Sequence, residues 1–222
     1  MEVIKTKKRY LSLLTGKTDM GKSTIATYDC SEKLREGQGA LFFSFEYCQS
    51  IIYNKFVSHF GLRWQELFKV DVVDGTKLVY DDVENIIRKK ASDIDVVYID
   101  YLDLLRMNTY NIEKKEVVDP TKIIHFQELI SKLAMLAYEL NLSIVVLSQE
   151  NSTGSFENTI EELNVLTSTI EHSHHIIKMF IGRDNVFSSK INCNDISHVV
   201  LVEGYNLKHF ASVNVKQLYK DF

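Results

Sequence analysis

The chain has 222 residues, which suits one domain with a buried core and is short for two. Hydrophobic residues make up 45% of it and charged residues 25%, near the average for globular proteins, so the composition favours neither the disordered nor the fibrous class. A formal net charge of −4 excludes an indiscriminate coat for nucleic acid, because such coats need an excess of Lys and Arg. We therefore expect residues 1–222 to form a single domain, with no separate N-terminal domain.

Membrane and disulfide signals are weak in this sequence. No apolar run approaches the roughly 18 residues of a membrane span, and the basic N-terminal stretch leads into only a short apolar-rich run. The three cysteines, Cys30, Cys48 and Cys193, form no CxxC pair, which argues against a disulfide framework and a zinc site. We expect a cytoplasmic protein with reduced thiols and no contact with a membrane.

Apolar runs typical of strands recur along the chain, and helix-compatible segments separate the earlier ones. The predicted strands are 10–14, 39–45, 70–74, 94–100, 142–148, 175–181 and 198–202, and the predicted helices are 24–35, 81–91 and 123–140. Alternating strands and helices, with strands too apolar for a solvent-facing side, predict an α/β fold: a mostly parallel central sheet flanked by helices. The last runs leave no room for helices, so we expect antiparallel strands to be added toward the C-terminus.

A phosphate-binding loop is the most specific motif. Residues 16–23 read GKTDMGKS and match GxxxxGK[ST] at every fixed position, between a strand-like run and a helix-compatible segment. This setting would surround a phosphate with backbone N–H groups and the positive end of a helix, which disfavours an ordinary turn. Lys22 would reach the β- and γ-phosphates, and the Ser23 hydroxyl would bind Mg²⁺. The predicted nucleotide-binding residues here are Gly16, Lys17, Thr18, Asp19, Met20, Gly21, Lys22, Ser23 and Thr24.

Polar side chains end three of the predicted strands, where open parallel sheets bind their ligands. Asp100 suits a carboxylate that supports Mg²⁺ from outside its direct ligands, and Glu46 is placed to polarise an attacking water. Ser148 and Gln149 carry neutral donors that suit sensing of a γ-phosphate. Each has a plainer interpretation as well: a turn aspartate, a solvated glutamate and a polar strand end.

Taken in order, these segments resemble the successive motifs of the RecA-like ATPase domain of DnaB-type replicative helicases. The resemblance runs from about residue 10 to residue 187, through GKTDMGKS, ALFFSFEY, VVYIDYLDLL, ELNLSIVVLSQ and IEHSHHIIKMFIGRDNVF. It implies a RecA-like P-loop NTPase fold that hydrolyses ATP with Mg²⁺. It also implies a homo-oligomer, usually a ring of subunits that moves on single-stranded DNA. Because the chain is minimal in size, we expect a phage-encoded member.

Carried over residue by residue, the resemblance implies a role for each polar position. Lys22 and Ser23 bind phosphate and Mg²⁺, and Asp100 supports Mg²⁺. Glu46 is the catalytic carboxylate, and Gln149 is the γ-phosphate sensor. The implied catalytic residues are therefore Glu46, Lys22 and Gln149.

The sequence departs from the family where an arginine finger is expected. Helicases of this type carry a basic motif near their C-terminal strands, whereas HVVLVEGYNLKHF has Glu203 and Gly204 and no arginine. We therefore expect slow intrinsic hydrolysis unless Lys208, Arg183 or a partner protein supplies the cation. Arg183 matches a family position near the nucleotide, so we count it as nucleotide-binding, although an ion pair with Asp184 in a turn is an equal alternative.

Two further departures concern DNA and assembly. Residues 106–122 mix basic and acidic side chains, and residues 150–177 contain five glutamates and neither Lys nor Arg. Such an acidic loop would repel a phosphate backbone, although main-chain amides in 152–155 could still bind one. Only about ten residues precede the first predicted strand, where helicases of this type carry a further domain or a linker helix.

Three functions therefore stay open. The first is a Mg²⁺-dependent ATPase of the DnaB-like helicase class, acting in DNA replication or recombination on single-stranded DNA. The second is a nucleotide-gated accessory or assembly module that hydrolyses ATP weakly and binds replication proteins rather than unwinding DNA. The third is a RecA-type recombinase, which would assemble as a filament.

Overall fold

The computed structural model describes residue 4 and residues 8–16, 21–105, 121–149, 175–181, 198–203 and 208–214. The strands are β1 (Tyr10–Gly16), β2 (Ala40–Ser44), β3 (Val70–Asp74), β4 (Val96–Asp100), β5 (Ser143–Gln149), β6 (His175–Ile181), β7 (His198–Glu203) and β8 (Lys208–Asn214). The helices are α1 (Lys22–Arg35), α2 (Gln49–Asn54), the π-helical turn η1 (Lys55–His59), α3 (Trp64–Leu67), α4 (Tyr80–Lys90), the 3₁₀ turn η2 (Leu102–Leu104) and α5 (Thr121–Leu140).

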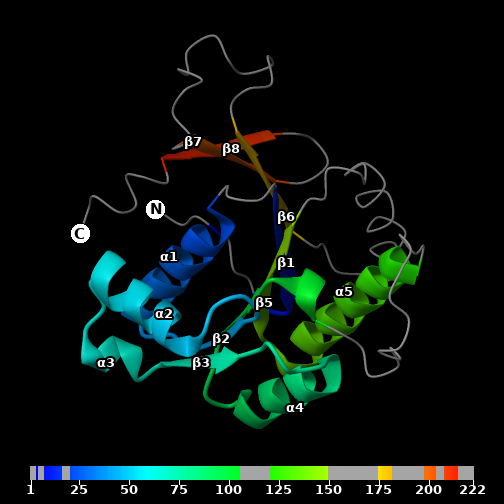
Figure 1. Cartoon of the computed structure of the whole chain (residues 1–222), viewed down its shortest axis with the longest axis horizontal. Helices are drawn as coiled ribbons and strands as arrows, with labels where there is room; N and C mark the ends of the chain where they lie inside the picture. Colours follow the sequence, from blue (N-terminus) through cyan, green and yellow to red (C-terminus); the bar gives the residue numbers. More distant parts are fainter. Residues whose placement is uncertain are drawn as a thin grey trace.

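The strands form one sheet in the order β3-β2-β4-β5-β1-β6-β7-β8 (Figure 1). All neighbours from β3 to β6 are parallel, and β7 and β8 continue the sheet as antiparallel strands. The predicted parallel sheet with antiparallel strands at its C-terminal edge is therefore confirmed. Strand β8 was not predicted, because its sequence, KHFASVN, is too polar to form an apolar run.

Helices cover both faces of the sheet, and each face has its own apolar core. Strand side chains alternate between the two faces, so Phe42 packs with α1 and α2, whereas its neighbours Leu41 and Phe43 pack with α4 and α5. We call these the α1 face and the α5 face (Figure 1). Strands β2 and β4 are buried along their whole length, as a parallel sheet covered on both sides requires.

Residues 49–67 fold into helical turns that the sequence did not predict. The segment lacks a long helical period, and short helices are held by tertiary contacts rather than by intrinsic propensity. The Gln49 amide donates to the Val72 carbonyl at 2.8 Å, and the Val72 N–H donates to the Tyr53 hydroxyl at 3.3 Å. The fully buried ring of Phe56 joins the core of the α1 face. These contacts fix α2 and η1 against β3 and the sheet.

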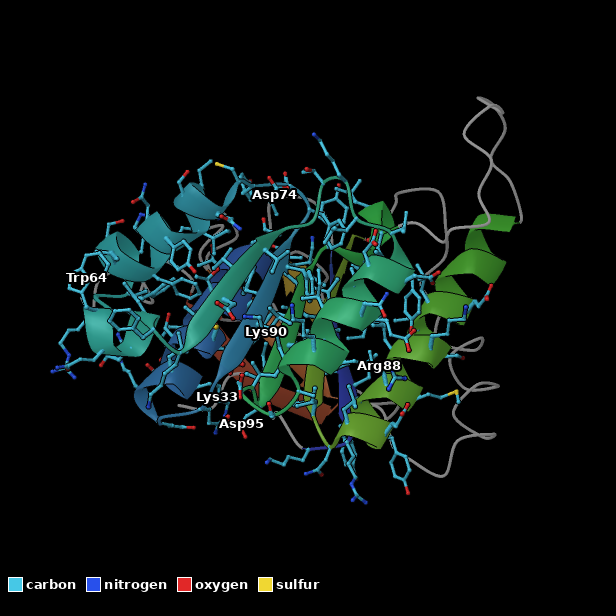
Figure 2. The ribbon with its side chains drawn as sticks, turned by 90° about the horizontal axis from the view of Figure 1, so that it is seen from below. Lys33, Trp64, Asp74, Arg88, Lys90 and Asp95 are labelled. Carbon is cyan, nitrogen blue, oxygen red and sulfur yellow. The ribbon has the colours of Figure 1, made fainter. Side chains whose placement is uncertain are left out.

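Helices α4 and α5 pack side by side on the α5 face, and Arg88 lies between them (Figure 2). Its guanidinium donates to both carboxylate oxygens of Glu139 on α5, at 2.8 Å each, and to Glu84 on its own helix at 2.8 Å. Both helices begin within two residues of their predicted starts. Over the part of the chain that the structure describes, none of the helices is long and apolar enough to cross a membrane.

Candidate functional site

The residue directly before α1 is a glycine in a left-handed backbone conformation. Gly21 has φ 84° and ψ 22°, in the left-handed region where a side chain would be strained. Helix α1 follows at once with Lys22, two residues earlier than predicted, and the Ile25 N–H donates to the Gly21 carbonyl at 3.0 Å. The first turn of α1 contains no acidic residue, so its positive end is not neutralised from within the helix.

Ser23 and Asp100 meet at the edge of the sheet. The Ser23 hydroxyl donates to Oδ1 of Asp100 at 3.1 Å, which joins the start of α1 to the end of β4. Asp100 is 1% exposed, and its Oδ2 has no hydrogen-bond partner among the described residues. A buried carboxylate oxygen without a donor, next to a hydroxyl, fits the neighbourhood of a hydrated Mg²⁺, which prefers oxygen ligands.

The charge of Asp100 depends on its surroundings. Burial raises the pKa of Asp100 to about 6, and the neighbouring Glu46 carboxylate raises it as well. The Ser23 hydrogen bond and the Lys55 and Lys22 ammonium groups act in the opposite direction. The pKa of this carboxylate is therefore set by the balance between burial and a small number of donors and cations, to which a bound divalent cation would add.

Glu46 lies beside Asp100 because β2 and β4 are neighbours in register. Ser44, the last residue of β2, pairs with Asp100, and the Phe45 N–H donates to the Asp100 carbonyl at 2.7 Å. Glu46 follows directly and is exposed, and its charge raises the pKa of Tyr101 as well as that of Asp100. The structure thus brings Lys22, Ser23, Glu46 and Asp100 to one edge of the sheet.

Strand β5 carries the predicted sensor pair to the same edge. Its parallel pairing with β1 sets Ser148 opposite Thr15 and the backbone of Gln149 opposite Gly16, at the start of the phosphate loop. The buried Ser148 hydroxyl donates to Oδ1 of Asp103 at 3.4 Å, just beyond the end of β4. The role of Gln149 as the γ-phosphate sensor stays a prediction.

Several predicted site residues lie outside the described residues. These are Lys17, Thr18, Asp19 and Met20 in the loop, and Arg183. The acidic segment from residue 150 to residue 174 and Gly204 also lie outside them. The roles assigned to these residues stay predictions.

Lys55 is a neighbour of the site that sequence reasoning missed. It lies nine positions after Glu46, and its Nζ is 4.4 Å from the centre of the Tyr47 ring. It is also the cation with the largest lowering effect on the pKa of Asp100. No sequence signal points to Lys55, because it belongs to the helical segment after β2 that was itself not predicted.

Comparisons with known proteins give a result at the level of structure. A scan against protein-family models and a search of curated protein sequences find no match. One similar solved structure is an ATPase domain, with a TM-score of 0.62 and 15% identity over 93% of this chain and 81% of that one. A DnaB-like replicative helicase, solved for its interactions with primase, has a TM-score of 0.62 and 15% identity. That match covers 94% of this chain, which spans 55% of the helicase.

A third similar structure is a KaiC-like protein from the archaeon Pyrococcus horikoshii OT3. It has a TM-score of 0.60 and 16% identity, over 92% of this chain and 84% of that one. Identities of this size show a shared fold. The chain therefore has the RecA-like fold of DnaB-type ATPase domains, in agreement with the resemblance found in its motifs.

Proposed function

We propose that this chain is a Mg²⁺-dependent ATPase with a DnaB-helicase-like core, acting in DNA replication or recombination on single-stranded DNA. One observation carries the proposal: Lys22, Ser23, Glu46 and Asp100 come together from three separate elements at one edge of a RecA-like sheet. A structural turn would not need a buried carboxylate facing the start of a helix. A phosphate site does need one, because the metal that accompanies the nucleotide must be held.

Each residue has a definite task in this proposal. Lys22 neutralises the β- and γ-phosphates at the positive end of α1. Ser23 would bind Mg²⁺ and Asp100 would support it from outside its direct ligands, and the bound ion would offset the charge that develops on the phosphate oxygens. Glu46, exposed beside Asp100, orients the attacking water and accepts its proton. Gln149, next to the start of the loop, donates to the γ-phosphate.

We further propose that the active form is a homo-oligomer, as a ring or a filament. The similar structures described above include a DnaB-like replicative helicase, and the resemblance of the motifs to that family implies a ring of subunits. Residues 198–210 offer no arginine that a neighbouring subunit could use as a finger. A cation from another residue or from a replication protein would therefore complete the site.

The missing arginine also favours a second candidate function. In this alternative the chain binds ATP, hydrolyses it slowly, and changes its affinity for replication proteins rather than unwinding DNA. The acidic composition of residues 150–177 supports it, because it weakens contact with a phosphate backbone.

The decisive experiment measures the ATPase rate of the purified chain against protein concentration, with and without single-stranded DNA. Lys22→Ala is the control, and we expect it to reduce the rate by at least about 100-fold, because it removes a charge that faces the transferred phosphoryl group. A steep rise with protein concentration supports completion of the site between subunits. Stimulation by DNA supports the helicase class.

Two outcomes would count against parts of this proposal. Turnover that Lys22→Ala leaves unchanged would rule out the ATPase assignment. Turnover that is lost in Lys22→Ala but insensitive to DNA and concentration would favour the nucleotide-gated module.

A further inference from the structure

A cation–π contact lies directly beside the proposed catalytic carboxylate. The Nζ atom of Lys55 is 4.4 Å from the centre of the Tyr47 ring, and Tyr47 is the residue after Glu46. An ammonium group within about 6 Å of an aromatic face is attracted by the ring electrons, more strongly where water is partly excluded. Both Lys55 and Tyr47 are half-buried, so this contact is partly shielded from solvent.

The backbone that carries Lys55 is held firmly. Lys55 is the first residue of the π-helical turn η1. Such turns are rare in proteins as a whole, but those that occur are often found at functional sites. The next residue, Phe56, is fully buried and packs edge-on against Phe42, with 6.2 Å between the ring centres. The preceding turn is tied to β3 through the Tyr53 hydroxyl. The backbone that carries the Lys55 side chain is therefore anchored on both sides of Lys55.

Hydrogen bonds from backbone N–H groups on both sides of Glu46 hold the turn that carries it. The Tyr47 N–H donates to the buried Ser44 hydroxyl at 3.1 Å, which closes the turn around Glu46. The Phe45 N–H donates to the Asp100 carbonyl at 2.7 Å, which ties the start of the turn to β4. Beyond Tyr47 the chain enters α2 through the exposed Cys48, whose carbonyl accepts a hydrogen bond from the Ile51 N–H at 3.1 Å and whose Sγ lies 3.2 Å from the Ser50 hydroxyl. The Lys55 contact adds a support for the Tyr47 side chain itself, directly after Glu46.

We propose that Lys55 is a positioning residue for Glu46. By holding the Tyr47 ring, its ammonium group fixes the turn from Phe45 to Cys48 and keeps the Glu46 carboxylate beside Asp100. This inference rests on the proposed ATPase function, and it assigns a task to a residue that is not in the phosphate loop. Positioning of this kind acts on the reaction step more than on binding, because a small displacement of a catalytic group costs rate.

The test compares steady-state ATPase kinetics of Lys55→Met, Lys55→Arg and a matched control, Lys89→Met. Methionine keeps the unbranched apolar stem and removes the charge, whereas arginine keeps a cation that binds aromatic faces. Lys89 is an exposed lysine on α4, on the opposite face of the sheet. We expect Lys55→Met to lower kcat about tenfold with KM for ATP within about twofold, and Lys55→Arg to restore most of the rate.

A second variant checks that the effect passes through the ring. Tyr47→Leu should lower kcat by a similar factor, and the double variant with Lys55→Met should be no slower than either single variant, because both changes remove one contact. Additive losses would overturn the proposed route through Tyr47. Thermal unfolding of each variant shows that the comparison is made between folded proteins.

Glu46→Gln separates failure of this inference from failure of the proposed function. If Glu46→Gln keeps the wild-type rate, the catalytic assignment is wrong and the role of Lys55 falls with it. If Glu46→Gln loses the rate while Lys55→Met matches Lys89→Met, the positioning role alone is overturned. If Lys55→Met raises KM and leaves kcat unchanged, Lys55 serves nucleotide binding instead, which also contradicts the proposal.

Discussion

The two faces of the sheet bury different kinds of side chain. On the α5 face, helices α4 and α5 cover an almost wholly apolar core, and their charged residues pair at the surface, as Arg88 does with Glu139. On the α1 face, helix α1 buries polar side chains of its own. One of them is the Asp29 carboxylate, which accepts a hydrogen bond from the Tyr98 hydroxyl at 2.7 Å. Asp100 lies on this face too, because it alternates with Tyr98 along β4.

The difference separates stability from function. Burial of apolar side chains lowers the free energy of the folded state without needing specific partners. Burial of a polar group raises that free energy unless its hydrogen-bond or charge partners are in place. The α5 face follows the first rule. The α1 face has an apolar core as well, but it also contains the buried Asp100 carboxylate, at the edge where we propose that a phosphate and a cation bind.

The largest expected effect on stability comes from the α5 face. Leu133 on α5 is fully buried, and Leu133→Ala should lower the free energy of unfolding by about 2–5 kcal/mol, because it removes apolar contacts and leaves a cavity. The ATPase rate per folded molecule should stay within about twofold. Urea unfolding with an active-site titration checks both. A large loss of rate in folded protein would mean that the two faces are not separate in function.

Asp100→Asn should behave in the opposite way to Leu133→Ala, because it should raise stability and lower the ATPase rate. Burial raises the pKa of Asp100 from the ordinary 3.8 to about 6, so the folded state holds its proton more tightly than the unfolded state does. Ionisation therefore weakens the wild-type fold as pH rises from about 4 to about 6, by at most about 3 kcal/mol. Without Mg²⁺ and nucleotide, Asp100→Asn should be more stable than wild type above pH 6 and equal to it below pH 4.

The same variant should lose Mg²⁺-dependent turnover, since the carboxylate charge is what faces the cation. Thermal unfolding across pH 4–8, together with ATPase assays, measures the two effects side by side. If Asp100→Asn were less stable than wild type at pH 7.5, burial of this charge would not be the destabilising feature that we infer.

The smallest expected effect concerns the ion pairs of the α5 face. Arg88→Met removes the contacts to Glu84 and Glu139, which are exposed to solvent and screened by salt. We expect the melting temperature to fall by less than about 2 °C, and the difference to shrink in 1 M NaCl. Differential scanning calorimetry of wild type and Arg88→Met at two salt concentrations measures both the fall in melting temperature and its dependence on salt. A larger, salt-independent drop would show that Arg88 serves packing between α4 and α5.

Much of the fold was predictable from the chain because the strands carry strong local signals. Strands β3 and β6 match their predicted bounds, and the helices before β2, β4 and β5 begin within two residues of prediction. The segment after β2 was missed, because α2 and η1 are held by hydrogen bonds to β3 and by the Phe56 ring. Strand β8 was missed because an added edge strand needs a partner for its backbone more than it needs apolar side chains.

The candidate site divides in the same way. Residue types and spacing predicted Lys22 and Ser23 from the loop motif, and Glu46, Asp100 and Gln149 from their places at the ends of apolar strand-like runs, which are visible in sequence. Spacing carries no information on which strands are neighbours, so the hydrogen bond from Ser23 to Asp100 and the raised pKa of Asp100 emerge only from the folded chain. The same holds for Lys55. Its place over the Tyr47 ring depends on a helical turn that tertiary contacts stabilise, and no local pattern predicts such a turn.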